Sequence, residues 1–135
     1  MCIRDRFYVD QSRFCVFDVS EPDAPFLTGS VDLPQSDHRR RLAVSSERVY
    51  VSEGGNGVRV IEVGSLSAPK LVATVELPGS LIDVVVAEPY LLTASSEGAL
   101  WVLDAADVPL PVPVESVEIP SGASDMVLTL SLIHI

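Results

Sequence analysis

Gly57-Val58-Arg59-Val60-Ile61-Glu62-Val63, followed by Pro69, decides the fold, because the same pattern occurs three times in the chain. The earlier copy is Phe14-Cys15-Val16-Phe17-Asp18-Val19 with Pro25, and the later copy is Leu100-Trp101-Val102-Leu103-Asp104-Ala105 with Pro111. Val16, Val60 and Val102 therefore share one column of a repeat, at spacings of 44 and 42 residues.

The residues around each copy predict short strands. Residues 26–33 and 70–77 alternate between apolar and polar side chains, and this period of two is typical of a strand with one covered face. Prolines and glycines separate the runs, and no helical period is sustained. Four strands in a unit of roughly 40 to 50 residues are the pattern of a β-propeller blade. A β-solenoid is the structural alternative, although its coils are usually shorter.

We therefore predict an all-β fold, an incomplete β-propeller with about three blades of four antiparallel strands each. The expected segments are a non-native tail (1–6), a partial first blade (7–34), a second blade (35–78), a third blade (79–120), the start of a fourth blade (121–129) and a second non-native tail (130–135). The first strand of a blade is almost wholly apolar and should be the inner one. The last strand carries prolines, which sheets tolerate mainly at an edge.

Composition excludes several classes of function. The net charge of −10 argues against nucleic acid as a partner, because phosphate binding needs a basic face. No apolar run approaches the roughly 18 residues of a membrane-spanning helix, so we expect no direct membrane insertion of this segment. Cys2 and Cys15 are too few for a disulfide framework.

The copies resemble LVIVD repeats, a propeller-type repeat of bacterial and archaeal proteins. The family pattern is carried here by Val49-Tyr50-Val51-Ser52, by Gly57-Val58-Arg59-Val60-Ile61-Glu62-Val63 and by Phe17-Asp18-Val19-Ser20-Glu21-Pro22-Asp23-Ala24-Pro25. Because many such proteins are exported or attached to the surface, the resemblance implies an extracellular, cell-surface or periplasmic location. It implies no catalytic residue.

The loop Asp37-His38-Arg39-Arg40-Arg41 is the main candidate for binding. It makes the connection between blades two residues longer than the next one, and such loops commonly carry function. Arginine suits a carboxylate or phosphate partner, and the alternative is a solvated loop balanced by acidic neighbours. Glu53 and Asn56 join this candidate surface from a glycine turn that lacks the spaced carboxylates of a Ca²⁺ loop.

Carboxylates recur at two further positions. Asp83 and Asp125 open equivalent inner strands and are weak metal candidates, because Ca²⁺ takes about six to eight oxygen ligands. We expect no cofactor, with Ca²⁺ as the one exception. The column of Asp18, Glu62 and Asp104 either binds cations or accepts hydrogen bonds from the turn that follows, and we favour the second interpretation.

These patterns predict a non-catalytic recognition or scaffold module that binds a protein or carbohydrate partner through loops between blades. The sequence contains no HExxH, CxxC or GxSxG motif. Trp101 is expected to pack between blades. The alternative function is part of a propeller enzyme, such as a lactonase or a quinoprotein-like oxidoreductase, with its catalytic residues outside this fragment.

Overall fold

The computed structural model describes residues 5–10, 12–21, 23–34, 40–45, 47–55, 57–65, 67–106 and 111–118. Every regular element in these ranges is a strand. The strands are β1 (Asp5–Val9), β2 (Arg13–Asp18), β3 (Phe26–Asp32), β4 (Arg40–Val44), β5 (Arg48–Glu53), β6 (Val58–Glu62), β7 (Lys70–Val75), β8 (Leu81–Ala87), β9 (Tyr90–Ser95), β10 (Ala99–Asp104) and β11 (Val112–Glu118). The expected start of a fourth blade (121–129) and the second tail (130–135) lie outside the described residues, whereas β1 begins within the expected first tail.

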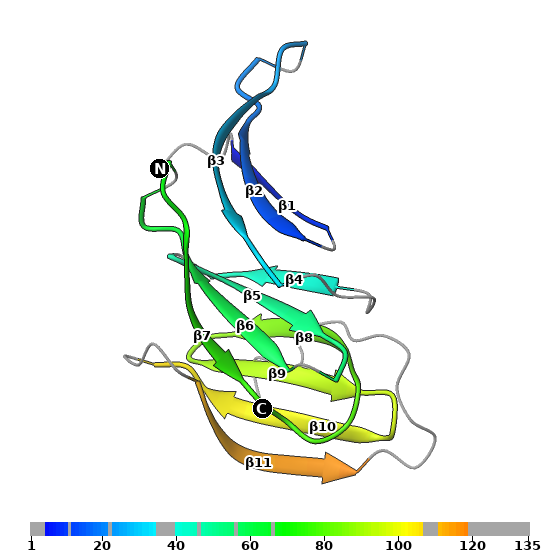
Figure 1. Cartoon of the computed structure of the whole chain (residues 1–135). Helices are drawn as coiled ribbons and strands as arrows, with labels where there is room; N and C mark the ends of the chain where they lie inside the picture. The colour runs from blue at the N-terminus through cyan, green and yellow to red at the C-terminus, as the bar shows by residue number, and fades with distance from the viewer. Residues whose placement is uncertain are drawn as a thin grey trace.

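The strands form three antiparallel sheets that succeed one another along the chain (Figure 1). The first sheet has three strands in the order β1-β2-β3, and the other two have four strands each, in the orders β4-β5-β6-β7 and β8-β9-β10-β11. Each sheet joins strands that are consecutive in sequence, as a propeller blade does. The prediction of an all-β, incomplete propeller is confirmed, and the sheets do not close into a ring.

The second sheet is covered on both faces, because its alternating side chains enter two different cores. The core shared with the first sheet includes Phe14, Val16, Val49, Val51 and Ile61. The core shared with the third sheet includes Tyr50, Val58, Val60, Leu91 and Leu103, and Trp101 packs against it as expected. Since full burial of one such aliphatic side chain contributes about 1.5–3 kcal/mol, stacking of neighbouring sheets is the main source of stability.

A backbone irregularity recurs with the sequence repeat. In the ladder between β2 and β3 the register shifts after Val16, between β6 and β7 after Val60, and between β10 and β11 after Val102. The unpaired residue lies on the outer strand in each case, at Thr28, Val72 and Val114. A β-bulge bends its strand and increases the local twist, so every outer strand turns at the same point of the repeat.

The order of strands within each sheet agrees with the predicted inner and outer positions. The first strands of the second and third sheets, β4 and β8, contact each other, and β4 also contacts β1 (Figure 1). At the opposite edge of the third sheet, β11 leaves Val112, Val114 and Val117 at least half exposed, at 50%, 55% and 50%. None of the residues described forms a long apolar helix that would cross a membrane.

Candidate functional site

Arg40 and Glu53, two residues of the predicted binding surface, form a buried ion pair. The hairpin of β4 and β5 places them directly opposite each other in the ladder. Arg40 Nη2 lies 3.0 Å from Glu53 Oε1, and the two side chains are only 2% and 0% exposed. Neither charge faces solvent, so each depends on its partners for stabilisation.

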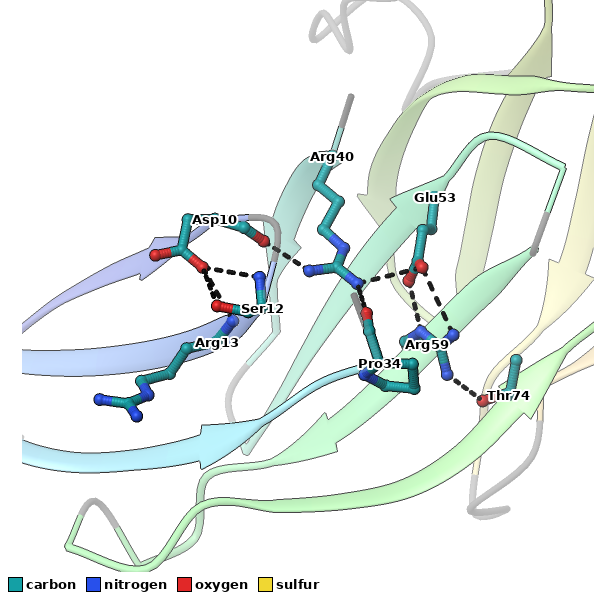
Figure 2. Close-up of polar contacts among 8 residues, drawn as sticks. All are labelled: Asp10, Ser12, Arg13, Pro34, Arg40, Glu53, Arg59 and Thr74. Atoms are coloured by element: carbon teal, nitrogen blue, oxygen red, sulfur yellow. Dashed lines mark hydrogen bonds and ion pairs between the residues drawn. The ribbon is translucent and has the colours of Figure 1, made fainter. Parts of the chain in front are cut away.

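Arg59 on β6 completes the coordination of this carboxylate. Its Nε donates to Glu53 Oε2 and its Nη2 donates to Glu53 Oε1 at 3.4 Å. Its remaining Nη1 donates to Thr74 Oγ1 at 3.3 Å, on the neighbouring strand β7. The cluster of Arg40, Glu53 and Arg59 therefore links all four strands of the second sheet (Figure 2).

Arg40 also joins the second sheet to the first. Its Nη2 donates to the carbonyl of Pro34 at 2.6 Å, and its Nη1 donates to the carbonyl of Asp10, in the turn between β1 and β2. Figure 2 shows the guanidinium between that turn and Glu53. One side chain thus holds three points of the chain at the contact between the two sheets.

The electrostatics of the cluster favour an ionised Glu53. Burial alone would raise the pKa of the Glu53 carboxyl, but the hydrogen bonds and positive charges of Arg59 and Arg40 outweigh it and hold the pKa below its usual value. In this arrangement the carboxylate has the partners that a buried charge needs.

The other residues of the predicted surface are placed as follows. Arg41 follows Arg40 on β4, and its buried Nε has no hydrogen-bond partner among the described residues. Asp37, His38, Arg39 and Asn56 lie outside the described residues. The binding role of these residues, and of Arg40 and Glu53, stays a prediction.

Asp83, the weak metal candidate on β8, is only 8% exposed and accepts a hydrogen bond from the backbone N–H of Val84 at 2.8 Å. Asp125 lies outside the described residues. Within the part of the chain that the structure describes, no three His, Cys, Asp or Glu side chains gather as metal ligands.

The recurring acids behave as turn acceptors where the structure shows their bonds. Asp18 Oδ1 accepts from the backbone N–H of Ser20 at 2.8 Å, and Asp104 Oδ1 accepts from that of Ala106 at 2.9 Å. This confirms the favoured interpretation for both residues. Glu62 is exposed at the end of β6, opposite Arg48 in the ladder.

A cavity of about 550 Å³ opens at the other end of the second and third sheets. Strand β5 runs from Arg48 at this cavity to Glu53 at the ion pair, so the two sites lie at opposite ends of the same strand. The lining comes from the β4–β5 turn, the β8–β9 turn and the residues after β10, and it includes Ser45, Glu47, Arg48, Glu88, Pro89 and Tyr90.

Hydrogen bonds hold the walls of the cavity in place. Ser45 Oγ donates to Glu88 Oε1 and thereby joins the turns of the two sheets. The backbone N–H of Ala105 donates to the carbonyl of Pro89 at 3.0 Å, and the equivalent bond in the second sheet joins Val63 to Glu47 at 2.9 Å. The sequence did not predict this cavity, because its residues come together only when two sheets stack. One signal was available in the sequence: a turn with charged residues precedes the second strand in both the second and the third blade.

The fold and its stacked, bulged sheets define the class as a propeller-type repeat protein. Residues 7–33 and 38–76 match the family model for the LVIVD repeat. The chain is an LVIVD-repeat protein, as its sequence pattern indicated. No curated protein matches it.

Proposed function

We propose that this chain is a non-catalytic recognition module of a larger LVIVD-repeat propeller, and that it binds its partner between adjacent blades. The observation that carries the proposal is the cavity between the second and third sheets. Its volume of about 550 Å³ lies within the range of about 300–1,000 Å³ that is usual for small-molecule sites. Its position on turns at the end of a packed scaffold is where binding residues are commonly found.

The proposed partner is a protein segment or a carbohydrate, and the chain binds it outside the cytoplasm. The acidity of the chain disfavours nucleic acid. The module needs no cofactor for this role, and no catalytic motif occurs in its sequence. The export of many proteins with this repeat supports an extracellular, cell-surface or periplasmic location.

The test uses a variant whose side chain fills the cavity, and it measures the effect on ligand binding. Ala106 lines the cavity, so Ala106→Trp should occupy it, whereas Ala68→Trp places the same group on an exposed turn of the second repeat. The intact protein is applied to a printed panel of oligosaccharides and short peptides. We expect saturable binding of at least one member, weakened at least about tenfold by Ala106→Trp and unchanged by Ala68→Trp. Panels without such a binder would overturn the proposal.

The loop of residues 34–41 is proposed as a second contact, for an acidic group. Because Arg40 is committed to Glu53, the variant to use is Arg39→Gln, with Lys70→Gln on the outer strand β7 as the matched control. Binding of a polyglutamate peptide at low salt should fall with Arg39→Gln and stay constant with Lys70→Gln. Equal binding of the two variants would remove this loop from the proposal.

A further inference from the structure

Hydrogen-bond donors and acceptors line the cavity between the second and third sheets. Glu47 and Glu88 supply carboxylate acceptors, Arg48 supplies guanidinium donors, and Ser45 carries a hydroxyl group that donates to Glu88. A ligand that satisfies such walls must accept and donate within a short distance. Hydroxyl groups do both, and a ring of hydroxyls does so in several directions.

Apolar groups also line the cavity. Tyr90 is 45% exposed there, whereas Tyr50, which also lines the cavity, is only 3% exposed. Pro89 and Val86 continue the apolar surface beside them. An exposed tyrosine ring offers a rigid platform with a polar tip, which suits a ligand with one apolar face and a polar rim.

Charge decides among the ligand classes that fit this shape. An anion would meet two lining carboxylates on a protein of net charge −10. A cation would be attracted by the two carboxylates but repelled by the guanidinium of Arg48. A wholly apolar ligand would desolvate the charged groups without replacing their hydrogen bonds. A neutral ligand that carries hydroxyl groups is repelled by neither sign of charge and can replace those hydrogen bonds.

We propose that this cavity binds a neutral sugar ring, with the apolar C–H face against Tyr90 and the hydroxyl groups on Glu47, Arg48 and Glu88. This inference rests on the proposed function, because it names the ligand of the same site. It assigns a recognition role to the β4–β5 and β8–β9 turns, and the first of these lies at the opposite end of β4 from Arg40 and Arg41.

The first experiment compares probes that differ mainly in charge. Titration calorimetry on the intact protein uses glucose, galactose and mannose, together with their 2-amino and 6-carboxylate derivatives at neutral pH. We expect a neutral hexose, or its disaccharide, to bind at least about tenfold more tightly than its amino and carboxylate forms.

The second experiment tests the platform. Tyr90→Ala should weaken binding of that sugar by at least about tenfold, and Tyr90→Phe should retain it, because the ring supplies the contact. Tyr8→Ala is the matched control, since Tyr8 is similarly exposed, at 53%, on β1 in the first sheet. Urea unfolding of each variant separates a local effect from a loss of folding, and the Phe variant keeps the test valid if the Ala variant unfolds.

The outcomes separate this inference from the proposed function. Tightest binding of an amino or carboxylate sugar, or equal losses in the Tyr90→Ala and Tyr8→Ala variants, would overturn the neutral-sugar inference. A peptide that binds and is displaced by Ala106→Trp, with no sugar bound, would also overturn it while leaving the recognition module intact. An absence of any ligand sensitive to Ala106→Trp would overturn both.

Discussion

Two equivalent carbonyl groups bind the next sheet by different means. Asp10 and Gly54 stand 44 residues apart, in the same column of the repeat. At the first interface, between the first and second sheets, the carbonyl of Asp10 accepts from the side chain of Arg40. At the second interface, between the second and third sheets, the carbonyl of Gly54 accepts from the backbone N–H of Leu81 at 3.0 Å.

The sequences at the two interfaces differ. Ile82 and Ser95 occupy the columns that Arg40 and Glu53 fill in the preceding blade, so the second interface has no charged pair at these positions. An isolated bridge of backbone groups between Gly54 and Leu81 joins its two sheets. The buried ion pair is therefore a feature of the first interface, and a single side-chain substitution can remove it.

The largest expected effect comes from breaking the first interface. Arg40→Ala leaves Glu53 buried with one arginine and removes the bonds to Asp10 and Pro34, so we expect a loss of about 3–5 kcal/mol in the free energy of unfolding. Urea unfolding of the intact protein measures it. Arg13→Ala is the control, because its ion pair with Asp32 is exposed and worth at most about 1 kcal/mol. Similar losses of stability in the two variants would contradict a stabilising role for the buried ion pair between Arg40 and Glu53.

The next effect concerns the turn that serves both interfaces. Gly57 has φ +87°, and a Cβ there would lie 2.0 Å from the carbonyl oxygen of Val75. Gly57→Ala should therefore cost about 2 kcal/mol or more and disturb Glu53 and Gly54 together. Gly55→Ala is the matched control, since nothing lies within 4 Å of its added Cβ. Equal unfolding midpoints for both variants would show that the turn adapts.

A pH titration sharpens the comparison at Glu53. Its pKa is lower in the folded protein than the ordinary value of about 4.3, so the unfolded chain binds more protons near that pH. The stabilisation is fully present above the unfolded-state pKa and is lost as the pH falls through the folded-state pKa. The free energy of unfolding, measured from pH 7 downwards, should drop in this window, and Glu53→Gln should flatten the dependence. A wild-type slope retained in Glu53→Gln would assign the titration to other groups.

The smallest expected effect concerns a turn hydrogen bond that the first and third sheets share. Asp18→Ala and Asp104→Ala each remove one hydrogen bond to a turn N–H, so each should cost about 1 kcal/mol. Thermal unfolding of the two single variants gives the comparison directly. A much larger loss for Asp104→Ala would mean that its turn also supports the cavity beside Ala106.

The sheets could be predicted from the sequence because their signals are local. Apolar runs, alternation and turn residues repeat at 42 to 44 residues, and each defines a strand without knowledge of its neighbours. The column of Val16, Val60 and Val102 was visible for the same reason. The bulge beside that column was not visible in the sequence, because a bulge depends on how two backbones pair rather than on the side chains of either strand.

The candidate site was only partly predictable. Arg40 and Glu53 were placed on one surface, but their pairing follows from the register of the β4–β5 hairpin, in which Val44 faces Val49. Once that register is set, the two charged side chains lie opposite each other and are buried. The cavity needs a further step, since its walls belong to turns of two different blades. A sequence pattern identifies each turn separately and does not give the spatial distance between two turns.

The recurring bulge also affects how the module behaves beside other proteins. An unpaired strand edge with a straight row of N–H and C=O groups is a template on which foreign strands can grow. Here β3, β7 and β11 each interrupt that row at Thr28, Val72 or Val114, and β11 further lacks an N–H at Pro113. Each of the three copies that the structure describes thus carries its own safeguard against fibril growth, built into the backbone and independent of surface charge.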